Sequence, residues 1–209
     1  MTHPWLRIPA SDYEAHMALP EVAQAQALNG LMASALRDYR PESLAVVGCT
    51  TGNGFEHIDP ARTRRAVGID INSDYLEILE SRFADKIPGL ELVEADIADP
   101  AFRIEPVAMI FAGLVFEYVD VSRALENMAR CMVHGGILVA VLQEPSDESA
   151  PVTETPYKSL ELLAPVMKLV PSEAFSKACG RVGLGLARAD TVPLKKGKSF
   201  FVGTYQKGD

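Results

Sequence analysis

Short apolar runs alternate with amphipathic stretches along most of this chain. The apolar runs lie near residues 44–48, 66–70, 90–95, 107–112 and 136–142. The stretches that separate them carry apolar residues at helical spacing and predict helices near 53–59, 74–85 and 121–132. Near-continuous apolar strands joined by helices are typical of an α/β fold whose parallel sheet is covered by helices on both faces.

The first 40 residues predict a helical cap ahead of this sheet. Ser11 and Glu14 have the spacing of a capping box, so we predict that a short helix begins there. Pro20 is expected to end that helix and to suit the first turn of the next one. This second helix ends before Pro41, and its apolar residues recur at helical spacing: Leu28, Leu31, Met32, Ala35, Leu36 and Tyr39.

The C-terminal part of the chain predicts two helices and then a hairpin. A polar, proline-rich loop over 144–156 precedes helical segments near 158–168 and 172–182. Two strands, 184–193 and 199–206, flank a turn that contains Lys195, Lys196 and Lys198. A terminal antiparallel hairpin leaves one edge of the sheet exposed, and we expect these lysines to protect that edge.

The composition is that of a globular protein with one domain over residues 1–209. The formal net charge of −8 argues against a nucleic-acid partner. The first 150 residues carry 11 Lys and Arg against 23 Asp and Glu, whereas the remainder carries 9 against 5. The basic remainder could favour an anionic substrate, although a solvated surface is the simpler interpretation.

Cysteine usage and hydropathy predict a cytoplasmic protein that does not enter a membrane. Cys49, Cys131 and Cys179 lie far apart without a C-x-x-C spacing, which favours reduced thiols. The N-terminus lacks an apolar core of signal-peptide length, and the longest apolar run, 107–116, is too short to span a bilayer. The four histidines show no metal-ligand spacing, so we predict no metal site.

The most informative segment is 44–54, LAVVGCTTGNG, in which an apolar run ends in a glycine-rich turn. A second apolar run ends in Asp70. This order predicts a nucleoside-cofactor site, because the N–H groups of such a turn approach the ligand and the carboxylate accepts from ribose hydroxyls. The spacing excludes a dinucleotide fingerprint, since Thr50 replaces the second glycine, and a phosphate-binding P-loop, since Phe55 follows Gly54.

With this turn the chain resembles the class I S-adenosylmethionine-dependent methyltransferases over residues 40–206. The segments that carry the resemblance are, in chain order, 48–52, 67–72, 92–97, 109–120 and 135–139. The resemblance implies a three-layer, Rossmann-like, seven-stranded, mostly parallel sheet with an antiparallel C-terminal hairpin. It implies a helical N-terminal cap over 1–40 and a core over 41–209 that binds S-adenosylmethionine.

Three positions depart from the family's pattern. Val46 stands where the family commonly has an acid, and Thr50 stands at the middle glycine, where the backbone approaches the methionine part of the cofactor. A threonine there could crowd the ligand, or it could donate its hydroxyl to the ligand's carboxylate. Val107 begins the fourth strand without the acid that is frequent in the family.

The resemblance implies a set of cofactor-binding residues: Gly48, Cys49, Thr50, Gly52, Asp70, Ile71, Asp96, Ile97 and Ala112. Asp70 would accept from the ribose hydroxyls, and Asp96 from the exocyclic amine of adenine while the Ile97 N–H donates to the ring. Asp70 could instead cap a helix, and Asp96 could be a turn acid. The glycines could serve only a tight turn, and Cys49 could be a small buried thiol.

The catalytic candidates come from two parts of the chain. Glu117 and Tyr118 follow the fourth strand, where the family often places groups that face the substrate. Tyr13 lies on the N-terminal helices, which close over the substrate in similar methyltransferases. Glu117 and Tyr118 could instead belong to a loop that leads into a helix capped by Asp120, and Tyr13 could be a packing residue.

The leading hypothesis is a methyltransferase that acts on a small molecule, with the acceptor, the atom methylated and the oligomeric state left open. The alternative is a catalytically degenerate cofactor-binding protein that acts through a partner, which Val46 and Thr50 motivate. A nicotinamide-dependent oxidoreductase is a third hypothesis, and the glycine spacing argues against it.

Overall fold

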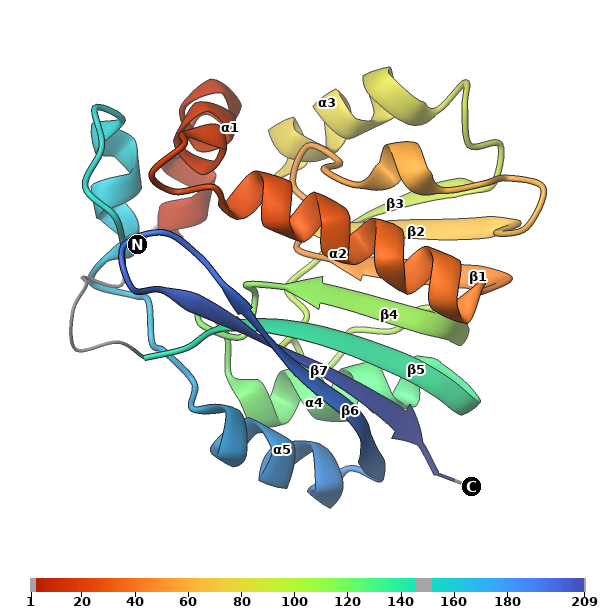
Figure 1. The fold of residues 1–209 in the computed structure, drawn as a ribbon. Coiled ribbons are helices and arrows are strands. Elements are labelled where there is room, and N and C mark those ends of the chain that lie inside the picture. The colour runs from red at the N-terminus through yellow and green to blue at the C-terminus, as the bar shows by residue number, and fades with distance from the viewer. Residues whose placement is uncertain (1–2, 146–151, 209) are drawn as a thin grey trace.

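The alternating apolar runs form five strands in the computed structural model, which describes residues 3–145 and 152–208. These strands are β1 (Ser43–Val47), β2 (Arg65–Asp70), β3 (Leu90–Glu94), β4 (Val107–Gly113) and β5 (Met132–Gln143). They are parallel to one another, and the hairpin adds β6 (Leu184–Pro193) and an antiparallel β7 (Ser199–Lys207). The sheet order is β3-β2-β1-β4-β5-β7-β6, which confirms the predicted seven-stranded, mostly parallel sheet (Figure 1).

Helices cover both faces of this sheet, as the pattern predicts. α2 (Gln24–Tyr39) and α3 (Ser73–Phe83) pack on one face, and their apolar residues share a core cluster with β1. α4 (Val121–Arg130) and α5 (Ser172–Arg181) pack on the other face and form a second cluster. Figure 1 shows these two layers above and below the strands.

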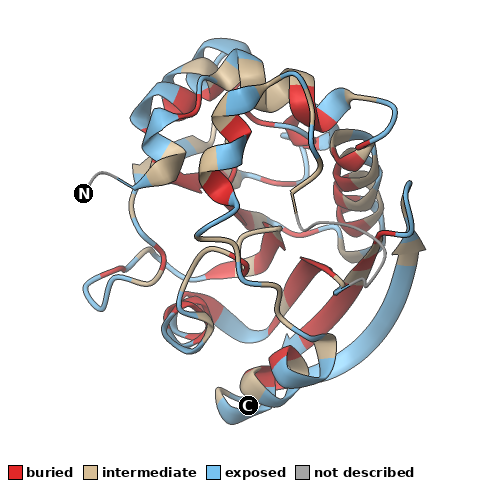
Figure 2. Cartoon of the chain, turned by 90° about the vertical axis from the view of Figure 1, so that its left-hand side faces the viewer, coloured by how far each residue is buried: buried red, intermediate tan, exposed pale blue. Residues whose placement is uncertain are grey.

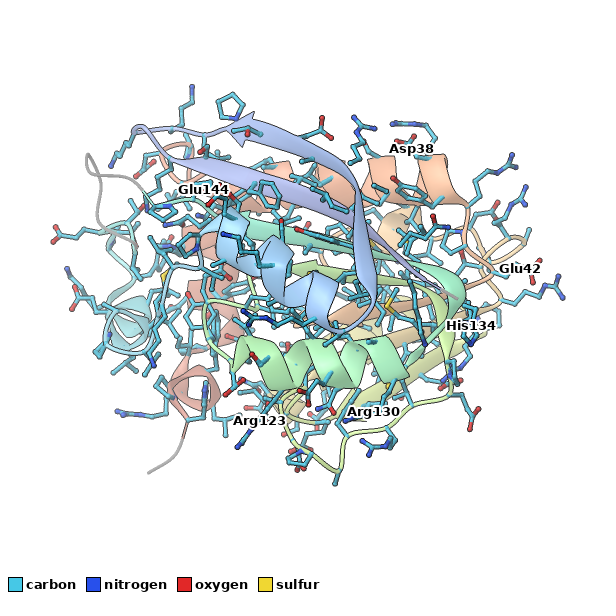
Figure 3. The ribbon with its side chains drawn as sticks, turned by 90° about the horizontal axis from the view of Figure 1, so that it is seen from below. Asp38, Glu42, Arg123, Arg130, His134 and Glu144 are labelled. Carbon is cyan, nitrogen blue, oxygen red and sulfur yellow. The ribbon has the colours of Figure 1, made fainter. Side chains whose placement is uncertain are left out.

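α4 shows how the sequence pattern places a helix. Leu125 and Met128 on one side of α4 are fully buried, whereas Arg123 and Arg130 are exposed. Figure 3 shows both arginines pointing outward from the molecule. One apolar and one charged face per helix therefore fix which side meets the sheet.

The hairpin closes one edge of the sheet without covering it. Along β6 only Leu184 is buried, whereas the central strands β1 and β2 are buried almost throughout. Figure 2 shows this contrast, with buried residues along the centre of the sheet and pale, exposed residues along its outer strand. The exposed edge that the sequence predicts is therefore present.

Two predictions for the N-terminal helices are wrong. α1 (Ala10–Ala18) confirms the predicted helix but not its capping box: the helix begins after Pro9, so Ser11 lies inside it, and Glu14 accepts hydrogen bonds from Thr51 and Arg82. Pro20 lies in the turn between α1 and α2 rather than in the first turn of α2. The long-range bonds of Glu14 thus replace the predicted capping box.

The helix predicted near 53–59 is also wrong, since only a short 3-10 helix, η2 (Phe55–His57), forms there. Gly52 and Gly54 adopt positive φ angles of 95° and 92°, which are incompatible with a continuous α-helix. The first segment predicted after the polar loop forms the 3-10 helix η3 (Lys158–Leu163). Part of that loop, residues 146–151, lies outside the described residues.

The N-terminal helices lie in two places, one against a face of the sheet and the others beside η3. α2 belongs to the layer on the sheet, whereas η1 (Pro4–Arg7) and α1 lie beside η3. Ile8, Leu160 and Leu163 form a small apolar cluster among these three elements. Within the described residues, no helix is long and apolar enough to cross a membrane.

Candidate functional site

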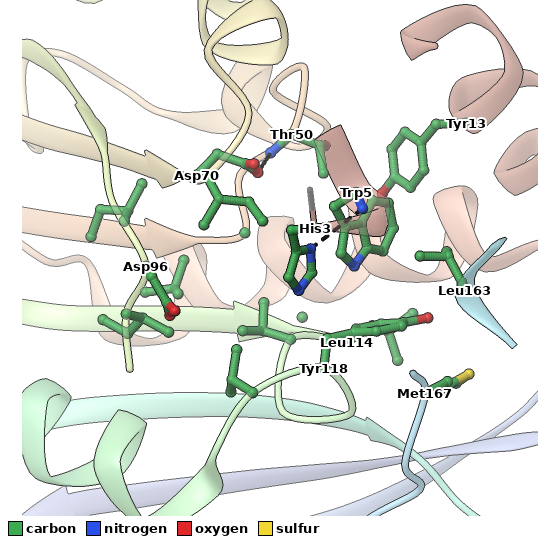
Figure 4. Close-up of a pocket in the computed structure, with 18 of the residues that line it drawn as sticks. His3, Trp5, Tyr13, Thr50, Asp70, Asp96, Leu114, Tyr118, Leu163 and Met167 are labelled. Atoms are coloured by element: carbon green, nitrogen blue, oxygen red, sulfur yellow. Dashed lines mark hydrogen bonds between the residues drawn. The ribbon is translucent and has the colours of Figure 1, made fainter. Parts of the chain in front are cut away.

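A cavity of about 580 Å³ lies at the carboxyl ends of the parallel strands, beneath η1, α1 and η3 (Figure 4). Its volume lies within the range of sites that enclose a small molecule. Six of the nine predicted cofactor-binding residues line it: Gly48, Thr50, Asp70, Ile71, Asp96 and Ile97. The fold therefore brings residues from three separate turns of the chain to one wall.

Asp70 ends β2 and is almost completely buried at the floor of this cavity. Its Oδ2 accepts from the Thr50 N–H at 2.9 Å and its Oδ1 accepts from the Asn72 N–H at 3.0 Å. Burial raises the pKa of Asp70, and the backbone donors around it oppose that rise. Because a carboxylate offers about four acceptor sites, Asp70 retains capacity for further donors such as hydroxyl groups.

The helix that follows Asp70 is capped by another residue. The Asn72 side chain accepts from the N–H groups of Asp74 and Tyr75 at the start of α3. The alternative that Asp70 itself caps this helix is therefore wrong.

Asp96 and Ile97 lie in the loop after β3, on the same side of the cavity as Asp70 (Figure 4). The exposed Asp96 carboxylate accepts from the Ala98 N–H at 2.8 Å and so stabilises the turn after β3. Asp96 also lines the cavity. Ile97 is buried, and its carbonyl accepts from the Asn127 side chain at 2.7 Å. That bond from α4 holds the loop against the core.

The glycine-rich turn lines the cavity, but the N–H groups of its first three residues donate to other protein groups and not toward the cavity. The N–H groups of Gly48 and Cys49 donate to the Ile69 carbonyl, and that of Thr50 donates to Asp70. The expectation that these N–H groups face a ligand is therefore wrong for these three residues. Gly48 and Thr50 have φ angles of 65° and 48°, which curve the backbone along the wall.

Three predicted cofactor-binding residues do not line the described cavity wall. The Cys49 thiol is buried behind the turn, and its pKa is raised well above the ordinary value by desolvation. A Cβ on Gly52 would lie 2.8 Å from the Phe83 ring, so this glycine permits close packing against α3. Ala112 is fully buried in β4, and its neighbour Gly113 lines the cavity instead.

Gly48→Ala is expected to lower the free energy of unfolding by about 1–3 kcal/mol. A Cβ at this position would lie 2.4 Å from Val115 Cγ2, and the φ of +65° is unfavourable for alanine. Urea denaturation measures the effect. Gly30→Ala is the matched control, because Gly30 is exposed within α2 with open space around it and should gain stability. Equal stability of Gly48→Ala and the native chain would contradict this packing argument.

Three aromatic side chains, from η1, α1 and the loop after β4, line another part of the cavity wall. The Trp5 ring lies 5.8 Å from the Tyr13 ring and 5.2 Å from the Tyr118 ring, centroid to centroid, in edge-to-face contacts. Desolvation raises the pKa of Tyr13 to about 12 and that of Tyr118 further. Both hydroxyls are therefore protonated at neutral pH and can donate hydrogen bonds, but they are weak bases.

Thr50 has a partner within the protein. A hydrogen bond with the Thr50 side chain lowers the pKa of Tyr13 and partly offsets the effect of burial. Figure 4 shows the two side chains near each other above the cavity. This contact ties the glycine-rich turn to α1.

Glu117, predicted to be catalytic, lies behind the cavity wall rather than in it. Its Oε1 accepts from the Gln143 N–H at 2.8 Å, and its Oε2 has no hydrogen-bond partner among the described residues. Desolvation raises its pKa to about 7. Since Gln143 does line the cavity, Glu117 is placed to position the end of β5.

Sequence reasoning missed Lys198. We expected this lysine to protect the exposed edge, but it is buried and lines the cavity, whereas Lys195 and Lys196 are exposed. The signal that could have found it is topological. An antiparallel β7 beside β5 begins at the carboxyl ends of the parallel strands, where ligands bind.

A family model described as a methyltransferase domain matches residues 45–140. A trans-aconitate 2-methyltransferase of Acidovorax sp. (strain JS42) is 27% identical over 110 residues, which are 52% of this chain and 41% of that protein. The chain thus spans less than half the length of the curated relatives that it matches.

Several solved methyltransferase structures have the same fold as this chain at low sequence identity. The CurJ carbon methyltransferase superposes with a TM-score of 0.71 and 19% identity, covering 100% of this chain and 62% of that one. Magnesium protoporphyrin IX methyltransferase (ChlM) from Synechocystis PCC 6803 with bound SAH has a TM-score of 0.68 and 12% identity, with 90% and 84% covered. At these identities, the likeness establishes the fold.

Proposed function

We propose that this chain is a class I S-adenosylmethionine-dependent methyltransferase that transfers a methyl group to a small-molecule acceptor, because a methyltransferase-domain model matches residues 45–140 and the fold is that of known methyltransferases. The observation that carries the proposal is the buried Asp70 carboxylate, which lies beside the glycine-rich turn in a cavity of about 580 Å³. A buried carboxylate with remaining acceptor capacity fits a ligand that presents hydroxyl groups.

The wall residues fit S-adenosylmethionine in the chemistry that they offer. Asp70 would hold the ribose hydroxyls, and Asp96 with Ile97 would hold the adenine. Gly48 and Thr50 would lie against the methionine part. When bound, the cofactor supplies a methyl group activated by a sulfonium sulfur.

The contribution of the protein to such a reaction is orientation and exclusion of water. The Trp5, Tyr13 and Tyr118 rings form a continuous wall over the cavity. The protonated hydroxyls of the two tyrosines would orient an acceptor by donating hydrogen bonds to it. Glu117 would act as a positioning residue through Gln143.

A small acceptor is supported by the shape of the site. The cavity lies beneath η1, α1 and η3, and the apolar contacts of Trp5 and Leu163 hold these elements together. The acidic charge of the chain disfavours a nucleic-acid acceptor. The alternative of a degenerate cofactor-binding protein receives no support, because Val46 packs in the core and does not line the cavity.

The test is transfer of label from methyl-labelled S-adenosylmethionine to a panel of small molecules, with trans-aconitate as the first acceptor because of the curated relative. RNA and DNA are included in parallel. We expect labelled product from one class of small molecule and none from nucleic acid. Label in nucleic acid, or no transfer to any acceptor, would contradict the proposal.

A further inference from the structure

The aromatic part of the cavity wall is assembled from distant segments of the chain. Trp5, Tyr13 and Tyr118 are each half-buried, and all three line the cavity. Figure 4 shows their rings beside Leu163, to the right of Asp70, and the three side chains pack against the apolar cluster that contains Leu163. Desolvation raises the pKa of both tyrosine hydroxyls, so this part of the wall is shielded from bulk water.

Two buried side chains at the start of α3 hold this aromatic wall in place. The Asn72 amide donates to the Trp5 carbonyl at 3.0 Å, and the Tyr75 hydroxyl donates to the Ile8 carbonyl at 2.9 Å. Asn72 is 5% exposed and Tyr75 is 1% exposed, so water does not compete for these bonds. The backbone that carries Trp5 is therefore fixed before a ligand arrives, which lowers the entropy that binding costs.

The aromatic wall adjoins the surface that we propose for the cofactor. Tyr13 is hydrogen-bonded to the side chain of Thr50, which would lie against the methionine part. Asn72, which holds Trp5, also donates its N–H to Asp70 Oδ1 at 3.0 Å. Methyl transfer needs the acceptor atom in line with the bond from the sulfonium sulfur to the methyl group. An acceptor that meets the methyl group beside Thr50 would therefore lie against these rings.

We propose that Trp5, Tyr13 and Tyr118 form the acceptor subsite and select a planar aromatic molecule as the methyl acceptor. Aromatic rings in edge-to-face or offset contact gain free energy beyond that of the area they bury. Apolar side chains of η3 and the segment after it continue the wall: Leu160, Leu163 and Met167. A cation also binds ring faces, but it would lose its hydration among these side chains. The inference rests on the proposed function and names its substrate class.

Calorimetry on the protein saturated with S-adenosylhomocysteine tests this inference. The probes are para-propylphenol, its saturated analogue propylcyclohexanol, and the cation cyclohexyltrimethylammonium. We expect para-propylphenol to bind about tenfold more tightly than either of the others. Trp5 is the one tryptophan in the sequence, so tryptophan fluorescence reports on this wall alone. The fluorescence should change over the same range of para-propylphenol concentration as the heat of binding.

Two variants separate recognition by the ring from a structural role. Trp5→Leu keeps an apolar side chain and should lower the preference for para-propylphenol over propylcyclohexanol from about tenfold toward none. S-adenosylhomocysteine binding should be unchanged, and a loosened η1 alone would weaken both probes without altering the preference. Tyr157→Leu is the matched control, because Tyr157 packs against the same apolar cluster but does not line the cavity. It should keep the native preference.

Four results would overturn the inference. They are para-propylphenol binding no better than propylcyclohexanol, tighter binding of the cation, binding of para-propylphenol without a change in tryptophan fluorescence, or the same preference in Trp5→Leu and Tyr157→Leu. Any of these with S-adenosylhomocysteine still bound refutes only the aromatic subsite. Failure of the native protein to bind S-adenosylhomocysteine would instead refute the proposed function.

Discussion

Asp70→Ala is expected to weaken S-adenosylmethionine binding by about 10- to 100-fold, which corresponds to about 1–3 kcal/mol. The substitution removes a buried carboxylate at the end of β2 that would accept from the ribose hydroxyls. It also removes the acceptor of the Thr50 and Asn72 N–H groups, which shape the adjoining turns. Isothermal titration calorimetry measures the affinity directly.

Two variants separate the ribose contact from general effects of charge and folding. Asp74→Ala removes an exposed acid from the first turn of α3, away from the cavity wall, and should bind as the native chain does. Asp70→Asn keeps the volume of the side chain and should fall between Asp70→Ala and the native chain. Native affinity in Asp70→Ala, with a cooperative unfolding transition, would exclude the ribose role.

Glu117→Gln is expected to change how stability depends on pH by as much as about 3 kcal/mol. The pKa of Glu117 is about 7 in the folded chain against an ordinary value of 4.5. The folded state therefore binds this proton more tightly than the unfolded state does. Stability is lost as the pH rises from about 4.5 to about 7, and it stays at the lower level above that range.

The glutamine has no such proton to lose. Relative to the native chain, Glu117→Gln should gain stability as the pH rises from about 4.5 and should be the more stable of the two at pH 8. Urea denaturation at several pH values checks this difference. Glu126→Gln on the exposed side of α4 is the control and should follow the native profile. A constant difference between Glu117→Gln and the native chain at all pH values would refute the account.

Local patterns in the sequence were sufficient to predict the strands of the sheet and the residues of one wall of the cavity. The strands containing Val67 and Ile110 are continuous apolar runs, which fixes them in the buried centre of a parallel sheet. An acid at the end of such a strand must lie at the edge where ligands bind, so Asp70 could be placed from its position alone. The seven-stranded, Rossmann-like arrangement was implied by the family resemblance, whereas the order of the strands comes from the structure.

Long-range contacts account for the failures. Glu14 has the correct spacing to cap a helix, but it pairs with Arg82, which is 68 residues away. Gly52 and Gly54 allow the turn to pack closely against α3 and α2, and a local helical pattern does not reveal this packing. We predicted that Lys198 protects the exposed edge of the sheet, but the antiparallel pairing of β7 with β5 brings it to the cavity.

Calorimetric titration of the purified protein with S-adenosylmethionine, and separately with S-adenosylhomocysteine, tests the central claim most directly. The account predicts one site with a dissociation constant in the micromolar range for each ligand. Absence of binding by both ligands, in protein with a cooperative unfolding transition, would contradict it. Tight binding of NAD in their place would contradict it in favour of a nicotinamide-dependent enzyme.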